Sequence, residues 1–165
     1  MRHITQFERS NGAAKHRTVS DKGLNLIKRF EGFSPTVYFC PAGYPTIGYG
    51  HVVKDNEEFS AGIDEAHAIA LLRQDTVVAE RAVLRLINVP LTSNQFDALV
   101  SFTYNLGGGA LQSSTLRRKI NRGEHNEAPE QFLRWVFAGG RKLKGLILRR
   151  QAEADLYQQV GLSIL

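Results

Sequence analysis

Residues 31–51 read EGFSPTVYFCPAGYPTIGYGH, and this stretch decides how the rest of the chain is interpreted. One acid, Glu31, stands at its start, and no second carboxylate follows before residue 51. The remainder is rich in glycine, tyrosine and β-branched residues, with Pro41 and Pro45 between short apolar runs. Runs of this kind, separated by tight turns, predict a small twisted antiparallel sheet over about residues 36–53.

The segment before this sheet has the pattern of an amphipathic helix. Ser20 is a suitable N-cap for DKGLNLIKRFEG, residues 21–32, which ends in a helix-stopping glycine. Leu24, Ile27 and Glu31 fall at i, i+3 and i+7, so Glu31 continues the apolar stripe. Burial and the negative end of the helix dipole both disfavour an ionised carboxyl group there, as a general acid requires. From the helix alone, an ordinary terminal glutamate bound by an arginine is the alternative.

Helical patterning dominates after Ile63. An unbroken helix of roughly 24 residues follows and spans about 36 Å, which is enough to link two lobes. Thr92 and Gln95 form a capping box at the start of the next helix, which stops at Gly107. Shorter helices are expected around 113–122, 127–137 and 145–158. The order predicts an α+β fold, mostly helical with a small antiparallel sheet, and a cleft between two lobes joined by the long helix.

The length of 165 residues fits one domain that buries its own core. We expect residues 1–19 to form an N-terminal extension and residues 20–165 to form the domain. Within it, the small sheet lobe takes up about 32–60 and the helical lobe about 63–165. The first twenty residues are polar and basic, without the apolar segment of a secretory signal, and no run approaches a membrane span. We therefore expect synthesis in the cytoplasm.

The charge balance favours an anionic partner. Lys and Arg number 21 against 16 for Asp and Glu, and the pI is near 9.6. Nucleic acid, a membrane surface and an acidic wall polymer all suit this balance. Because the basic residues are spread over several predicted helices and match no nucleic-acid-binding motif, we expect no nucleic acid partner. The histidines have no metal-ligand spacing, so we expect no metal and no cofactor.

Three residues in the opening stretch have a characteristic spacing. Cys40 follows Glu31 by nine positions, and Thr46 follows Cys40 by six. Glu31 begins the motif EGF, Thr46 begins the motif TIGYGH, and a tyrosine lies between the two motifs. This pattern closely resembles the phage-type lysozymes, the endolysins of glycoside hydrolase family 24, whose mark is a glutamate, an aspartate or less often a cysteine, and a threonine. LTSNQFDALVSFTYNLG and RWVFAGGRKLKGLILRRQAEADLY resemble the central and C-terminal helix patterns of that family. The resemblance covers about residues 20–158.

The resemblance implies a lysozyme-like fold and hydrolysis of the β-1,4 bond between N-acetylmuramic acid and N-acetylglucosamine in peptidoglycan. It implies that Glu31 is the general acid, that Cys40 takes the second catalytic position, and that Thr46 helps to hold the attacking water. It also implies a monomer made in the host cytoplasm, which reaches the wall after a separate protein permeabilises the membrane. Anionic wall polymers are possible further partners.

Cys40 is the only cysteine, so no intramolecular disulfide forms. Inverting glycosidases need a base that activates water, and retaining ones need a nucleophile. A thiolate suits either role, although an ordinary thiol is mostly protonated at neutral pH. Basic neighbours that favour the thiolate, or direct attack on the anomeric carbon, would overcome this. The structural alternative for Cys40 is a small buried hydrophobic residue.

Further residues are candidates for binding substrate. Tyr44 and Tyr49 are expected to offer flat rings to sugars, although both also suit a sheet and its turns. Asn105 is a candidate to hydrogen-bond acetamido groups. The family resemblance implies that an arginine, Arg149 or Arg150, reaches the acid across the cleft; a solvated face with an Arg149–Glu153 pair is the alternative.

The resemblance also implies that His51 and Asp75 pair across the lobes, as a structural ion pair rather than a catalytic dyad. Two other functions fit the chain. A lytic transglycosylase cleaves the same bond with Glu31 alone and leaves a 1,6-anhydro sugar. A non-enzymatic basic protein would bind the wall or disturb membranes, and RKLKGLILRR, residues 141–150, is basic and apolar enough for that role.

Overall fold

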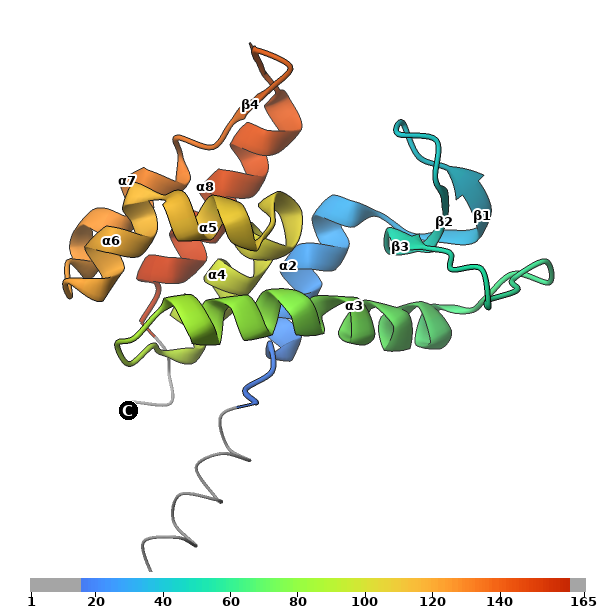
Figure 1. Cartoon of the computed structure of the whole chain (residues 1–165), viewed down its shortest axis with the longest axis horizontal. Coiled ribbons are helices and arrows are strands. Elements are labelled where there is room, and N and C mark those ends of the chain that lie inside the picture. Colours follow the sequence, from blue (N-terminus) through green and yellow to red (C-terminus); the bar gives the residue numbers. More distant parts are fainter. Residues whose placement is uncertain (1–15, 161–165) are drawn as a thin grey trace, which may run out of the picture.

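The helix that carries Glu31 lies between two lobes, one built around a small sheet and the other helical (Figure 1). The computed structural model describes residues 16–160. The helices are α2 (Asp21–Glu31), α3 (Glu65–Leu86), α4 (Ser93–Leu106), α5 (Gly108–Ser113), α6 (Thr115–Asn121), the 3-10 turn η1 (His125–Glu127), α7 (Ala128–Phe132) and α8 (Lys144–Gln158). The strands are β1 (Ser34–Phe39), β2 (Pro45–Gly48), β3 (His51–Val52), β4 (Phe137–Ala138) and β5 (Arg141–Lys142). The fold class predicted from the sequence is confirmed.

The sheet lobe is a three-stranded antiparallel meander in the order β1-β2-β3. Tyr38 pairs with Thr46 and Ile47 with His51, and the β1–β2 register is irregular between Ser34 and Tyr38. The central strand β2 is buried, and it packs on the first turns of α3. Gly48 permits this approach, since a Cβ there would lie 3.1 Å from the Cβ of Ala68.

Helix α3 runs along both lobes, as its length in the sequence predicts (Figure 1). It has 22 residues, and the Asp64 side chain caps it by accepting a hydrogen bond from the backbone N–H of His67. Its first half supports the sheet and its second half packs against α4 and α5. One continuous element therefore fixes how far apart the lobes lie.

Helix α4 is the centre of the helical lobe, with α2, α3 and α8 packed around it. Nine of its fourteen residues are buried, including Phe96, Leu99 and Phe102, so it has no solvent face over most of its length. Its N-terminus has the predicted capping box: Thr92 accepts from the backbone of Gln95, whose side chain accepts from the backbone of Thr92. The prediction of this helix and its cap is confirmed.

The end of the chain differs from the sequence prediction. The helix expected over 127–137 ends at Phe132, and β4 and β5 form a hairpin instead. Gly139 and Gly140 have φ of 58° and 77°, the left-handed values that a two-residue hairpin turn requires at both positions. The expected helix was wrong at its C-terminal half because these two glycines close a hairpin rather than separate two helices.

Residues 16–19 pack onto the helical lobe, whereas residues 1–15 of the expected extension lie outside the described residues. Val19 is 2% exposed, and its backbone N–H donates to Glu80 Oε2 at 2.6 Å. Ser20 occupies the predicted N-cap position of α2 but does not cap it with its side chain. Its hydroxyl and its backbone N–H instead donate to the Asp97 carboxylate on α4. Carboxylates from α3 and α4 thus hold the start of the helix that ends at Glu31.

Within residues 16–160, no helix combines the length and the apolar character that crossing a bilayer requires.

The tight contact at the start of α2 leads to a first prediction. A Cβ at Gly23 would lie 2.5 Å from Val19 Cγ2 and 2.6 Å from Asp97 Cβ. We expect Gly23→Ala to lower the free energy of unfolding by about 1–3 kcal/mol, because the packed neighbours must shift. Urea denaturation measures this change.

Gly145 provides the control, since it lies in α8 and a Cβ added to it would have no neighbouring atom within 4 Å. Gly145→Ala should leave stability unchanged or raise it by up to about 1 kcal/mol through helix propensity. Equal effects of the two substitutions on the free energy of unfolding would show that the close contacts at Gly23 do not exclude a side chain there.

Candidate active site

A cleft of about 460 Å³ lies beside Glu31, between the sheet lobe and the helical lobe. Its walls come from the end of α2, from strand β3 and the loop around it, from α3 and from the end of α4. The lining residues are Glu31, Gly50, His51, Val52, Lys54, Asp75, Tyr104 and Asn105. The cleft between lobes expected from the order of elements is therefore present, and it holds four of the residues singled out in the sequence.

Glu31 is held by Arg149 and has a glycine close to its other oxygen. Arg149 Nη1 donates to Glu31 Oε1 at 2.8 Å, across 118 positions of sequence. On the other side lies Gly50, where a Cβ would approach Glu31 Oε2 to 3.1 Å, so a larger residue would push on this carboxyl group. Gly50 also has φ of 86°, which favours glycine. The Glu31 side chain is 23% exposed, which leaves it accessible from the cleft.

Arg149 is itself fixed by buried partners. It is 3% exposed, and its Nη2 donates to the carbonyl oxygen of Ser101 at 3.3 Å. Its Nε lies 3.4 Å from Glu153 Oε2, and Ser101 Oγ donates to the same oxygen at 2.5 Å. The Arg149–Glu153 pair therefore exists, but at the α4–α8 interface and not on the solvated face proposed as the alternative. Glu153 orients the guanidinium that meets Glu31.

Arg150 does not reach Glu31 or the cleft surface. It is completely buried, and its Nε approaches Glu153 Oε1 to 2.7 Å with poor hydrogen-bond alignment, so the attraction is mainly electrostatic. Its Nη2 donates to Asn105 Oδ1 at 2.8 Å. A direct substrate contact expected for Arg150 does not fit this burial. Arg150 instead fixes the Asn105 amide, whose NH₂ group remains available to a ligand in the cleft.

Cys40 lies at the start of the β1–β2 turn and Thr46 lies beside it in β2, and neither lines the cleft cavity. The backbone of Tyr44 hydrogen-bonds the thiol and lowers the pKa of Cys40; partial burial opposes this, and the Ala42 and Gly43 backbone and the Thr46 hydroxyl reinforce it. Backbone donors, not basic side chains, therefore favour the thiolate. Thr46 is 3% exposed and its hydroxyl donates to the Tyr44 carbonyl oxygen at 2.9 Å.

The two tyrosines expected to stack on sugars differ in exposure. Tyr44 is 59% exposed at the hairpin turn and is accessible to a ligand. Tyr49 is 7% exposed, packs against Phe33 with ring centroids 5.4 Å apart, and donates its hydroxyl to Glu65 Oε1 at 3.0 Å. The ring of Tyr49 supports the sheet lobe, so a stacking role for it does not fit the structure.

His51 is bound by two carboxylates. Its Nδ1 lies 2.8 Å from Asp75 Oδ2 on α3, and its Nε2 lies 2.8 Å from Glu57 Oε1. Burial on its own lowers the pKa of His51, but the hydrogen bonds to Glu57 and Asp75 outweigh it and raise the pKa above its ordinary value. Asp75 is the partner that the family resemblance implied. Nothing in the sequence pointed to Glu57.

Sequence reasoning missed Tyr104, which lines the cleft at the end of α4. Burial raises the pKa of the Tyr104 hydroxyl, and the nearby carboxylates of Glu31 and Asp75 raise it further. The phenol is therefore a neutral hydrogen-bond donor over the whole physiological pH range. The only signal in the sequence was its position beside Asn105.

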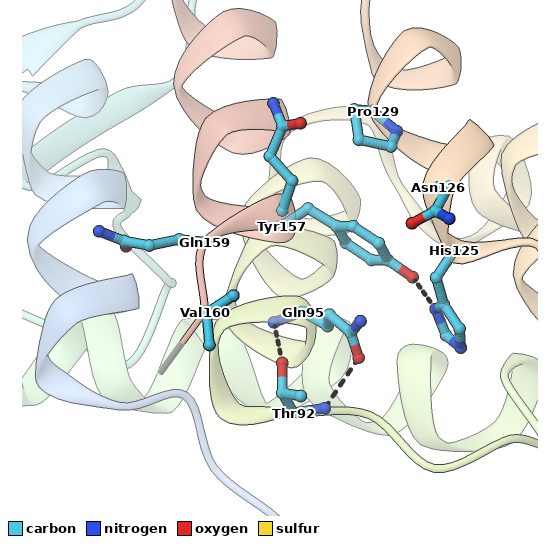
Figure 2. A pocket seen from close by; sticks show the side chains of 9 residues that line it. Thr92, Gln95, His125, Asn126, Pro129, Tyr157, Gln159 and Val160 are labelled. Atoms are coloured by element: carbon cyan, nitrogen blue, oxygen red, sulfur yellow. Dashed lines mark hydrogen bonds between the residues drawn. The ribbon is translucent and has the colours of Figure 1, made fainter. Parts of the chain in front are cut away.

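A second cavity, of about 250 Å³, lies at the other end of α4 and shares no lining residue with the cleft beside Glu31. Figure 2 shows that two structural contacts form its walls: the Thr92–Gln95 capping box and the 2.7 Å hydrogen bond between His125 Nδ1 and the Tyr157 hydroxyl. Among residues 16–160, no three His, Cys, Asp or Glu side chains gather as a metal site would require.

Comparisons with known proteins agree with this geometry. The family model described as Phage lysozyme matches residues 28–153. The chain is 43% identical over 141 residues to an endolysin of Bacillus phage B103, covering 84% of this chain and 53% of that protein, so it spans about half of that relative's length. It is 42% identical over 144 residues to an endolysin of Acyrthosiphon pisum secondary endosymbiont phage 1, covering 85% of this chain and 97% of that one.

A solved structure is similar over the same region. The muramidase domain of SpmX from Asticaccaulis excentricus superimposes with a TM-score of 0.78 at 38% identity, covering 88% of this chain and 99% of that domain. Fold, cleft and similarity together define a protein of the lysozyme class. The chain belongs to the phage lysozyme family.

The contacts of His51 predict a pH-dependent stability. Because the pKa of His51 is raised on folding, its stabilisation is complete below pH 6.5, the ordinary value, and is lost as pH rises through the folded-state pKa. We expect His51→Gln to lower the free energy of unfolding by about 1–3 kcal/mol at pH 5.5 and by less at pH 9. Thermal unfolding across this range measures the difference.

The exposed His67 serves as the control, since its side chain forms no ion pair within residues 16–160. His67→Gln should shift stability equally at both pH values. A His51→Gln deficit that stays constant between pH 5.5 and pH 9 would contradict the assignment of a charged imidazole.

Proposed function

We propose that the chain hydrolyses the β-1,4 bond between N-acetylmuramic acid and N-acetylglucosamine in peptidoglycan, and so lyses the host cell wall. The observation that carries this proposal is Glu31, held by Arg149 beside an inter-lobe cleft. A carboxyl group in a fixed position beside a cleft suits protonation of the glycosidic oxygen as the bond breaks. Family membership supports the same reaction.

In this proposal, Cys40 is the second catalytic group. The lowered pKa of its thiol makes the thiolate more available near neutral pH, as both a base and a nucleophile require. Thr46 lies beside the thiol, and its one hydroxyl proton has two acceptors in reach, the Tyr44 carbonyl oxygen and the Cys40 sulfur. With either acceptor, the Thr46 oxygen is left to accept a hydrogen bond from the attacking water.

Substrate contacts follow from the exposed groups of the site. Tyr44 offers an aromatic face to a sugar ring, and the Asn105 NH₂ group and the Tyr104 hydroxyl offer donors to acetamido oxygens. The chain then acts as a monomer on peptidoglycan. It is made in the host cytoplasm and reaches the wall once a separate protein permeabilises the membrane, and anionic wall polymers attract its basic surface.

Product analysis with a Glu31 variant tests the reaction. We expect wild-type protein to release fragments with hydrated reducing ends at muramic acid from purified peptidoglycan. Glu31→Gln should lower the rate by about 100-fold or more, the usual contribution of a general acid. Mass spectrometry of the released fragments, with Glu130→Gln as an exposed-acid control, measures both.

Two results would overturn hydrolysis. Fragments lighter by one water would identify a lytic transglycosylase and place Cys40 outside the chemistry. Unchanged release of fragments by Glu31→Gln would remove Glu31 from the reaction.

Cys40 is tested separately through its thiol. We expect iodoacetamide to inactivate the wild-type protein, since Cys40 is the only cysteine. Cys40→Asp should stay active, resist the reagent and work at lower pH, because a carboxyl group ionises at lower pH than a thiol. Cys40→Ala should lose activity by about 100-fold. Full turnover after alkylation would show that the thiol takes no part.

A further inference from the structure

The chain has two groups of basic residues after residue 110, and the structure gives them different surroundings. The first group, on and after α6, is bound by protein partners. Lys119 and Arg122 pair with Glu124, and Lys119 also pairs with Glu127. Arg117 and Arg118 donate to carbonyl oxygens, those of Leu86 and Gln112 and that of Ser113. Local partners therefore account for this group.

The second group lies on the β4–β5 hairpin and the start of α8, and its cations have no such partners among residues 16–160. Arg141, Lys142 and Lys144 are exposed, and within residues 16–160 none of them forms an ion pair. The segment 137–148 contains no acid at all. The β4–β5 hairpin that begins this segment projects from the helical lobe (Figure 1). Within residues 16–160, its three positive charges therefore have no compensating carboxylate.

Apolar side chains are exposed among these cations. The exposed fractions are 58% for Phe137, 44% for Leu143, 43% for Ile147 and 48% for Leu148. Lys142 Nζ lies 5.7 Å from the centre of the Phe137 ring, so a charge and an aromatic ring are direct neighbours at the hairpin. We call these seven residues the hairpin patch: Phe137, Arg141, Lys142, Leu143, Lys144, Ile147 and Leu148.

The hairpin patch is separate from the catalytic cleft, whose lining includes none of its members. Arg149 and Arg150, which continue the basic run in the sequence, are buried and take no part in it. A dissolved polyanion would be bound by the cations alone, and exposed apolar side chains would add nothing to that binding. A lipid surface uses both, because phosphate groups meet the cations while apolar side chains enter the acyl boundary.

We propose that the hairpin patch docks the protein on membrane surfaces that contain anionic phospholipids. Phe137 at the hairpin, Leu143 at the N-cap of α8 and Ile147 in its first turn enter the interface. Arg141, Lys142 and Lys144 then lie at the level of the lipid phosphates. The docking is peripheral and does not depend on hydrolysis of the wall.

Vesicle co-sedimentation tests the proposal with the full-length protein. We expect binding to vesicles of phosphatidylglycerol and phosphatidylcholine, and little binding to phosphatidylcholine alone. Each basic side chain near an anionic surface contributes about fivefold to binding, so Lys142→Glu should weaken it by at least that factor. Phe137→Ser should weaken it by about tenfold, through lost apolar burial.

Arg118→Glu is the matched control, because it makes the same change of charge in the first group, where Arg118 is exposed. It should leave vesicle binding within about twofold, since it lies outside the patch. All three variants should keep the thermal stability of the wild type and its activity on soluble peptidoglycan fragments.

Four outcomes would overturn the proposal. Absence of binding to the anionic vesicles would do so directly. If Arg118→Glu weakened vesicle binding as much as Lys142→Glu does, the net charge of the protein would explain the binding without the patch. If Phe137→Ser binds vesicles as well as the wild type does, and if the wild type binds soluble polyphosphate as tightly as it binds anionic vesicles, the patch is a site for polyanions. Loss of activity on soluble fragments in the patch variants would assign the hairpin to the substrate cleft.

Discussion

The geometry of the site depends on the contacts that the buried Glu153 carboxylate makes. This carboxylate has no solvent exposure and meets two arginines of its own helix together with the Ser101 hydroxyl of α4. A buried charge is tolerated only with such partners, so the α4–α8 interface is specific as well as tightly packed. Through Arg149 this interface reaches Glu31, and through Arg150 it reaches Asn105. Two groups of the cleft are thus oriented from inside the helical lobe.

The other end of α2 is held by a comparable arrangement. The Glu80 carboxylate of α3 accepts a hydrogen bond from the backbone N–H of Val19. The Asp97 carboxylate of α4 accepts one from the backbone N–H of Ser20. Glu31 therefore stands on a helix that is fixed at both ends, while His51 and Asp75 connect the sheet lobe to α3. The basic residues in the second half of the chain fall into three sets. One set pairs with nearby acids on and after α6, and the buried Arg149 and Arg150 orient groups of the cleft. The third set is exposed in the hairpin patch.

Sequence reasoning predicted the parts of the fold that local patterns specify. Caps, apolar periodicity and turn residues are local, and they predicted α2, the small sheet, α3 and α4 close to their observed bounds. The β4–β5 hairpin was missed because Gly139–Gly140 was interpreted as a linker between helices. Tyr49 and Arg150 were expected to meet substrate, yet burial of the first against Phe33 and of the second against Glu153 depends on packing that no local pattern reveals.

The sequence by itself determined the order of elements from α2 to α4, the family, and the candidate acid with its unusual cysteine, because these depend on residue types and their spacing. Only the tertiary structure decided which arginine meets Glu31, that Glu57 is the second partner of His51, and which cations have no ion-pair partner in the described part of the chain, residues 16–160. These contacts join residues up to 118 positions apart. Their distances follow from how α2, α3, α4 and α8 pack, and sequence spacing along one element carries no information about that packing.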